Sequence, residues 1–154
     1  MKGQVAVIGA SECSKEEWDV AYEVGRLIAK SGWVLVCGGR GGVMEAACKG
    51  AYEEGGITVG ILTTTTGEDA NPYVKIKINT GMGHNRNPIV VLSGDFVVAI
   101  GGRWGTLSEL AYSKIYGKPV IGYKTLQIEG IENYEDFDGF FKRLEVILLD
   151  FKNV

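Results

Sequence analysis

The sequence has few of the residues that build metal sites, disulfide frameworks and catalytic triads. Its 154 residues include one histidine, His84, and three cysteines, Cys13, Cys37 and Cys48. Three is an odd number and no C-x-x-C spacing occurs, so we expect no metal site and no disulfide framework. Free thiols fit a reducing cytoplasm. One histidine and no G-x-S-x-G motif leave little basis for a serine hydrolase.

Basic stripes and long apolar runs are also missing. The formal net charge is −3 and the pI is about 5.2, which disfavours nucleic acid and anionic membranes as partners. The apolar runs are too short to span a bilayer, and the first residues lack the apolar region of a signal peptide. We therefore expect a cytoplasmic protein.

Two familiar phosphate motifs are absent. No lysine follows a glycine loop where G-x-x-x-x-G-K-[ST] requires it, which argues against a P-loop NTPase. The turn after the first apolar run contains only one glycine, Gly9, so the dinucleotide motif G-x-G-x-x-G is missing from its usual place. An NAD enzyme is correspondingly disfavoured.

Glycine, in contrast, is abundant. It accounts for 23 of 154 residues, about twice the average usage, and the glycines cluster after apolar runs. The length suits a single domain over residues 1–154. Apolar runs alternate with segments of helical periodicity, which predicts a three-layer α/β/α fold with a mainly parallel sheet of about six strands. The predicted strands are 4–10, 33–37, 57–62, 74–78, 96–100 and 119–123, and the main helices are 15–31, 43–54, 88–92, 106–116 and 135–150.

Several helix starts carry capping patterns. Ser14 with Glu17, and Thr106 with Glu109, have the spacing of capping boxes, and Asn87 before Pro88 fits an N-cap followed by the first helical residue. The 74–78 strand alternates polar and apolar residues, which places it near a sheet edge. The 89–92 segment is apolar on all sides, so we expect it to pack against a second copy of the chain.

Two segments combine a buried strand, a glycine turn and a helix start: 34–45 and 95–110. Unpaired N–H groups at a helix N-terminus attract anions, above all phosphate. A third loop, 9–14, also follows a strand. In open parallel sheets, ligands bind at the carboxyl ends of the strands where the strand order reverses. A phosphate-bearing ligand is therefore the leading prediction.

Three motifs resemble one known superfamily. G-G-R-W-G-T-L-S-E at 101–109 is similar to the P-G-G-x-G-T-x-x-E signature of the LONELY GUY phosphoribohydrolases and the molybdenum cofactor carrier proteins, with Ile100 in place of the proline. G-G-R-G-G-V-M-E-A-A at 38–47 resembles the first glycine loop of the shorter, carrier-like branch. G-M-G-H-N-R-N at 81–87 resembles the segment that carries an essential arginine in the hydrolases; Arg86 matches it, and Asn87 replaces a lysine.

The resemblance implies a SLOG-type Rossmann-like fold, homo-oligomers and a site on the glycine loops. It does not imply a pyridoxal-phosphate lysine decarboxylase, the label such proteins often carry. The expected ligand-binding residues are Gly9, Ala10, Ser11, Gly38, Gly39, Gly41, Gly42, Val43, Glu45, Arg86, Asn87, Gly101, Gly102, Gly105 and Thr106. Arg40 and Arg103 lie inside the glycine loops and either clamp phosphate or remain solvated.

Two functions stay open at this point. One is a binding protein, a carrier or sensor, for a nucleotide or molybdopterin-type ligand. The other is a hydrolase that releases base and ribose 5-phosphate from a nucleoside 5′-monophosphate, with Arg86 and Glu109 as catalytic residues. There, Arg86 would orient the phosphate, and Glu109 would stabilise oxocarbenium-like charge or activate water. Glu109 also has a purely structural reading, as the capping residue of its own helix. Ile100 and Asn87 favour the binding protein. His84, beside Arg86, either titrates near neutral pH as part of the site or has a purely structural role.

Overall fold

The computed structural model describes residues 2–153. Seven strands form one sheet in the order β4-β3-β2-β1-β5-β6-β7, and each neighbouring pair is parallel. The strands are β1 (Gln4–Gly9), β2 (Val34–Cys37), β3 (Thr58–Leu62), β4 (Ile76–Asn79), β5 (Phe96–Ile100), β6 (Val120–Tyr123) and β7 (Glu132–Tyr134). The helices are α1 (Lys15–Lys30), α2 (Val43–Glu53), α3 (Asn87–Leu92), α4 (Trp104–Ile115) and α5 (Phe137–Leu149), with short 3₁₀ helices η1 (Gly83–Arg86) and η2 (Phe151–Asn153).

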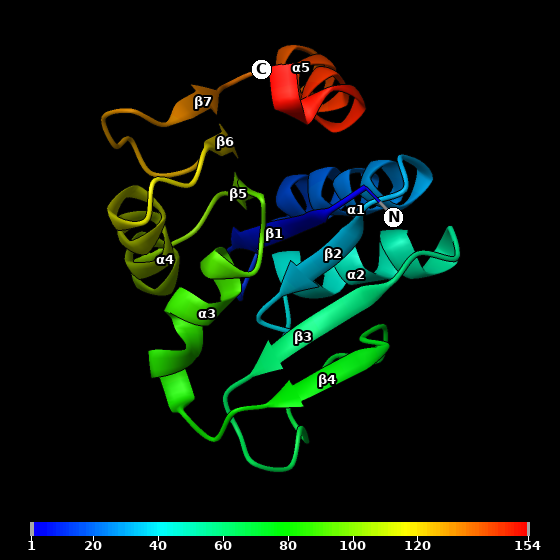
Figure 1. The fold of residues 1–154 in the computed structure, drawn as a ribbon, viewed down its shortest axis with the longest axis vertical. Coiled ribbons are helices and arrows are strands. Elements are labelled where there is room, and N and C mark those ends of the chain that lie inside the picture. Colours follow the sequence, from blue (N-terminus) through cyan, green and yellow to red (C-terminus); the bar gives the residue numbers. More distant parts are fainter. Residues whose placement is uncertain (1, 154) are drawn as a thin grey trace.

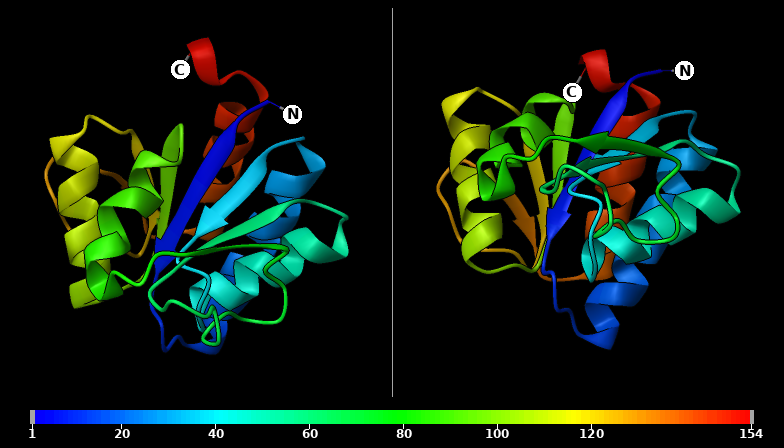
Figure 2. Two further views of the ribbon diagram at one scale, coloured as in Figure 1. Left: turned by 60° about the horizontal axis from the view of Figure 1, so that its bottom comes forward. Right: turned by 90° about the horizontal axis from the view of Figure 1, so that it is seen from below.

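Helices cover both faces of the sheet, as Figures 1 and 2 show. Alternate residues of a strand point to opposite faces. Val5 and Val7 of β1 accordingly join the core under α1, α2 and α5, whereas Ala6 and Ile8 join the core under α3 and α4. The predicted three-layer α/β/α architecture is confirmed. The sheet has seven strands where about six were expected, because β7 is only three residues long and carries no apolar run.

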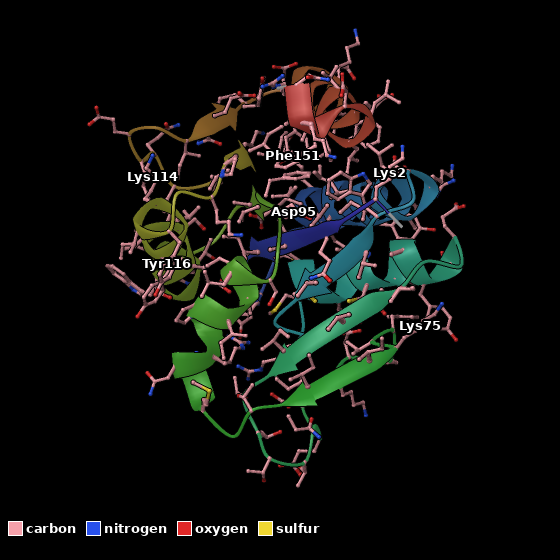
Figure 3. The ribbon with its side chains drawn as sticks, viewed as in Figure 1. Lys2, Lys75, Asp95, Lys114, Tyr116 and Phe151 are labelled. Atoms are coloured by element: carbon pink, nitrogen blue, oxygen red, sulfur yellow. The ribbon has the colours of Figure 1, made fainter. Side chains whose placement is uncertain are left out.

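An aromatic cluster closes the α5 side of the core. The Phe151 ring stacks on Phe96 at a centroid distance of 5.4 Å and meets Trp33 edge-on at 5.9 Å (Figure 3). The indole N–H of Trp33 donates to the Leu148 carbonyl at 2.9 Å, which satisfies its one polar atom. These contacts join the end of α5 to the start of β2 and β5.

The strand order reverses at β1. β2 lies on one side of it and β5 on the other, with Ala6 opposite Val36 and Gly9 opposite Ile100. Because all three strands run in the same direction, the loops that follow them meet at one edge of the sheet. This is the position at which open parallel sheets bind ligands.

The helix starts agree only in part with the predicted caps. The Ser14–Glu17 capping box is present: the Ser14 hydroxyl accepts from the Glu17 N–H at 3.1 Å, and the Glu17 carboxylate from the Ser14 N–H at 2.8 Å. The Asn87 N-cap is wrong, because η1 runs directly into α3 and Asn87 is already helical. The Thr106–Glu109 capping box is also wrong, because α4 begins at Trp104, with Arg103 at the N-cap position and no side-chain cap.

The β4 strand lies at the sheet edge, as its alternating sequence predicted, and all four of its residues are exposed. Ile76 and Ile78 pair with Val59 and Ile61 of β3. They therefore lie on the face that carries α3 and α4, but no helix covers the β4 strand in the view of Figure 1. Among residues 2–153, no helix is both long enough and apolar enough to cross a membrane.

Candidate functional site

A cavity of about 300 Å³ opens where the loops after β1, β2 and β5 meet. Its walls come from these three loops, from η1 and from the first turns of α2 and α4. The lining residues are Gly9, Ala10, Ser11, Glu12, Arg40, Met44, His84, Arg86, Asn87, Arg103, Gly105, Thr106 and Glu109. The cavity therefore unites the three segments that the sequence singled out.

The first glycine loop is packed directly on the loop after β1. Gly42 has φ +64°, and a Cβ atom there would lie 2.2 Å from the Ala10 carbonyl oxygen. The Val43 N–H donates to the same oxygen at 2.9 Å. A side chain at position 42 would be strained and would also push these loops apart, so this glycine determines the shape of the cavity wall.

The second glycine loop leaves the N-terminus of α4 open to the cavity. Gly102 has φ +116°, and Thr106 packs against it so closely that a Cβ atom there would lie 2.4 Å from the threonine side chain. A Cβ atom on Gly105 would meet nothing within 4 Å. Since no side chain caps this helix, the N–H groups of its first turn are available to an anion.

Arg86 is buried at the end of η1, and the main chain holds its guanidinium group. The Nε atom donates to the Ile61 carbonyl at 2.8 Å, and Nη2 donates to the Gly38 carbonyl at 3.3 Å. Nη1 donates to the Asn87 side-chain oxygen. These bonds occupy three of the five N–H donors of a guanidinium, which leaves two for the cavity. Burial lowers the pKa of Arg86, and the nearby Glu109 opposes that effect.

Asn87 links Arg86 to α4. Its side-chain oxygen accepts from Arg86, and its Nδ2 donates to the Ser108 hydroxyl at 2.9 Å. That hydroxyl in turn donates to the Gly105 carbonyl at 2.7 Å. A lysine has no acceptor atom, so the lysine that the hydrolase motif carries at this position could not make the same bridge.

Glu109 lies one turn into α4 with its side chain 8% exposed. The Ser113 hydroxyl donates to the main-chain carbonyl of Glu109 at 2.8 Å, but no hydrogen bond to its carboxyl group is found within the described residues, and Glu109 lines the cavity. Burial raises its pKa to about 8, although the charge of Arg86 acts in the opposite direction. At neutral pH the group is therefore mostly protonated, and it can donate a hydrogen bond without repelling a phosphate.

The cavity brings together some of the predicted site residues and not others. It is lined by the predicted residues Gly9, Ala10, Ser11, Arg86, Asn87, Gly105, Thr106 and Glu109. The predicted residues that do not line it are Gly38, Gly39, Gly41, Gly42, Val43, Glu45, Gly101 and Gly102. Several of these shape the loops instead: the Gly38 carbonyl holds Arg86, and Gly42 holds the loop after β1.

Glu12 and Met44 line the cavity, although neither was among the residues predicted to bind a ligand. Glu12 follows β1 and Met44 lies in the first turn of α2, and no motif marks either one individually as a site residue. Arg40, Arg103 and His84 reach the cavity as well.

Cys37 and Cys48 are buried and free, with their sulfur atoms 3.5 Å apart. In residues 2–153, no cluster of three or more His, Cys, Asp or Glu side chains is suited to a metal ion.

Comparison with known sequences identifies a family and two related proteins. The sequence model of the SLOG cluster4 family matches residues 2–146. A protein of Archaeoglobus fulgidus without an assigned function is 47% identical over 86% of this chain and 87% of its own length. A probable cytokinin riboside 5′-monophosphate phosphoribohydrolase of Oryza sativa subsp. japonica is 27% identical over 77% of this chain, but over only 54% of its own.

Two solved structures have closely similar folds. The molybdenum cofactor binding protein of Rippkaea orientalis has a TM-score of 0.87 and 34% identity, over 96% of this chain and 98% of that one. The molybdenum cofactor carrier protein of Chlamydomonas reinhardtii has a TM-score of 0.83 and 34% identity, over 96% and 99%. Both likenesses extend over nearly the whole of each chain.

Proposed function

This chain belongs to the SLOG cluster4 family, and from that premise we propose that it is a binding protein for a phosphorylated pterin-type or nucleotide ligand. The molybdopterin type is the first candidate, because the two structural neighbours at 34% identity are molybdenum cofactor binding and carrier proteins. The phosphate would sit on the N–H groups of residues 102–106, since the Leu107 N–H already donates to the Arg103 carbonyl, and the rest of the ligand would lie in the cavity beside Arg86.

The observation that carries the proposal is the pairing of an uncapped helix N-terminus with three arginines around one cavity. Arg40, Arg86 and Arg103 all line it, and α4 presents its first-turn N–H groups without a side-chain cap. Helix N-terminal amides bind phosphate through N–H groups that have no other partner, and guanidinium groups bind it through two parallel N–H donors. A neutral Glu109 removes the repulsion that an ionised carboxylate would exert there.

A second candidate is the hydrolysis of nucleoside 5′-monophosphates. The rice relative supports it, as does the approach of Glu109 to Arg86. A protonated Glu109 is a poor stabiliser of oxocarbenium charge at neutral pH, however, because that role needs the carboxylate. The binding function is therefore the stronger proposal.

The test begins with native mass spectrometry of freshly purified protein, in which a co-purifying phosphorylated small molecule is expected. Titration calorimetry with inorganic phosphate, AMP and GMP then measures affinity, and chromatography of the same mixtures detects free base. Binding without base release supports the proposal. Base release that disappears in Glu109→Gln would replace it with the hydrolase, and no binding of any phosphate compound would refute both.

We also propose that the chain forms a homo-oligomer. Of the apolar helix residues expected at the contact, Val90 and Val91 are buried inside the chain, whereas Leu92 is 46% exposed. The open sheet face adds Ile76 and Ile78, at 49% and 45% exposure. Apolar side chains exposed together often mark a protein interface. Multi-angle light scattering at micromolar concentration should give a mass above that of one chain, and a monomer mass would refute the idea.

A further inference from the structure

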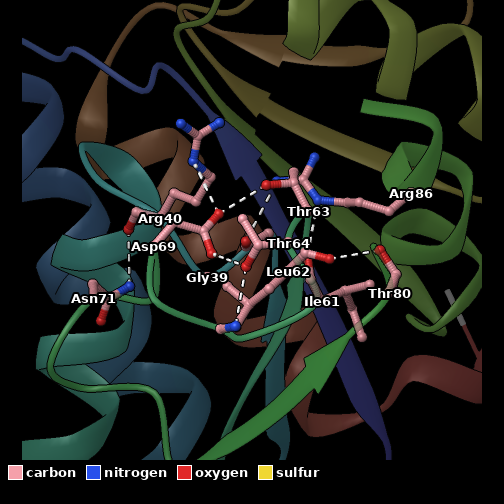
Figure 4. Close-up of polar contacts among 12 residues, drawn as sticks. Gly39, Arg40, Ile61, Leu62, Thr63, Thr64, Asp69, Asn71, Thr80 and Arg86 are labelled. Atoms are coloured by element: carbon pink, nitrogen blue, oxygen red, sulfur yellow. Dashed lines mark hydrogen bonds and ion pairs between the residues drawn. The ribbon is translucent and has the colours of Figure 1, made fainter. Parts of the chain in front are cut away.

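The connection between β3 and β4 folds back over the first glycine loop, beside the cavity. We call residues 63–71 the threonine loop, since it begins with four successive threonines. Figure 4 shows Asp69 at its centre, between the threonines and Arg40. The threonine loop lies outside the proposed phosphate site, since none of its residues lines the cavity.

Asp69 is fixed by the threonines. The Thr63 hydroxyl donates to one carboxylate oxygen at 2.8 Å, and the Thr64 hydroxyl to the other at 3.0 Å. The Gly67 N–H donates to the Thr64 hydroxyl at 3.0 Å, which closes the turn. Burial would raise the pKa of Asp69, but these hydrogen bonds and the charge of Arg40 outweigh it and leave the pKa below its ordinary value. The carboxylate is thus ionised and held in one orientation.

Asn71 fixes the main chain of the glycine loop. Its N–H donates to the Gly39 carbonyl at 2.8 Å, and its Nδ2 donates to the Arg40 carbonyl at 2.9 Å. The Asn71 side-chain oxygen accepts from the Tyr73 N–H at 3.0 Å. The backbone on either side of the Arg40 Cα atom is therefore tied to the threonine loop.

The Arg40 side chain is held at its near end. Its Nε atom lies 3.5 Å from an Asp69 carboxylate oxygen, and in Figure 4 the two terminal nitrogens point away from Asp69. Arg40 lines the cavity together with Arg86, and the two like charges oppose each other, since Arg40 contributes to lowering the pKa of Arg86. Asp69 supplies a countercharge to Arg40, and its charge also acts to raise the pKa of Arg86.

We propose that Asp69 is a positioning residue, which holds Arg40 through Nε so that its two terminal nitrogens present a fork to the phosphate of the ligand. Two parallel N–H groups match two oxygens of a phosphomonoester, and a guanidinium held in advance loses less conformational freedom on binding. This inference rests on the proposed function, because it assigns Arg40 to the same phosphate.

The substitution Asp69→Asn gives a result of opposite sign for the two explanations of this aspartate. If Asp69 were only a nearby negative charge, its removal would strengthen the binding of an anion. If it positions Arg40, removal frees a long side chain and weakens binding, by about three- to tenfold for one released rotamer-rich residue. The direction of the change in Kd therefore separates the two.

The experiment measures Kd for GMP and for inorganic phosphate by calorimetry in the wild type, Asp69→Asn, Arg40→Gln and the double variant. Glu68→Gln is the matched control. Glu68 is exposed, and its substitution removes one negative charge from the same loop, as Asp69→Asn does. We expect Asp69→Asn to weaken binding, Glu68→Gln to leave it unchanged or slightly stronger, and Asp69→Asn to have no further weakening effect in the Arg40→Gln background. Weakening in that background as well would mean that Asp69 only maintains the loop, and would overturn the inference.

A readout without ligand tests the positioning itself. In ¹H–¹⁵N spectra of the free protein, the Arg40 Nε–H signal, assigned by its loss in Arg40→Gln, should be protected from exchange in the wild type and unprotected in Asp69→Asn. If the wild type binds neither compound, the proposed function fails and this inference falls with it. If the wild type binds and Asp69→Asn binds as tightly or more tightly, only the inference is overturned.

Discussion

Replacing Glu109 with glutamine should make the protein more stable at neutral and alkaline pH. Glutamine has the shape of the protonated carboxyl group but cannot ionise. The pKa of Glu109 rises from 4.5 to about 8 in the folded chain, so the folded state favours the protonated form. At about 1.4 kcal/mol per tenfold change in the ionisation constant, this costs the wild type roughly 3 kcal/mol of unfolding free energy at pH 7 and roughly 5 kcal/mol above pH 8.

The sign follows from the direction of the pKa change. Below about pH 4.5 both the folded and unfolded wild type carry a protonated Glu109, so the two proteins should be equally stable. As the pH rises towards 8, the unfolded chain loses this proton first, and the wild type loses stability relative to Glu109→Gln. Above pH 8 the difference should become constant.

The assay is urea denaturation of both proteins at intervals from pH 4 to pH 9. Glu129→Gln is the control, because Glu129 is exposed and outside the cavity, and its difference from the wild type should not change in this way. A Glu109→Gln protein that is less stable than the wild type at pH 8, or a difference independent of pH, would refute a neutral, buried Glu109.

Three further predictions concern other parts of the chain. Gly42→Ala should lower the unfolding free energy by about 2 kcal/mol or more, since the added Cβ atom would meet the Ala10 carbonyl oxygen; Gly32→Ala, at φ +81° with nothing within 4 Å, should cost clearly less in the same denaturation assay. Gly105→Val should change stability by within about 1 kcal/mol, because the position is open, yet weaken GMP binding about tenfold or more in calorimetry; unchanged affinity would mean that the ligand does not reach the start of α4. Ile78→Lys should reduce the mass seen by light scattering to that of one chain, and an unchanged mass would place the contact elsewhere.

Much of the fold was predictable because its strands are continuous apolar runs. Phe96–Ile100 is buried throughout. A short apolar run of this kind between glycines is typical of a buried strand. The glycine turns also predicted the edge of the sheet at which the cavity lies. The β7 strand was missed because Glu132–Tyr134 contains no such run, and pairing with β6 alone makes it a strand.

The details of the site were harder to predict, because they depend on where helices begin. Thr106 and Glu109 have the spacing of a capping box, but the turn at Gly102 lets α4 start at Trp104. Glu109 is therefore a full turn inside the helix, and its carboxyl group faces the cavity. Likewise, the 3₁₀ turn before α3 makes Asn87 helical and directs its amide to Arg86. Sequence spacing alone does not contain these shifts of the N-cap, by one residue in α3 and by three in α4.

The way in which Arg86 is held has a consequence for how freely the surrounding sequence can vary. Two of its three protein partners are main-chain carbonyls, of Ile61 and Gly38. Any residue supplies a carbonyl, so valine or leucine at position 61 would leave the guanidinium in place, provided that the strand still packs. Of the two positions that supply carbonyls, only 38 is restricted, because a Cβ atom there would lie 2.5 Å from Arg86 Nη2; the third partner, the Asn87 side chain, does depend on residue identity. The position of the Arg86 side chain thus depends more on the backbone conformation than on the side chains of Ile61 and Gly38. Substitutions in β3 that preserve its backbone should leave Arg86 in place.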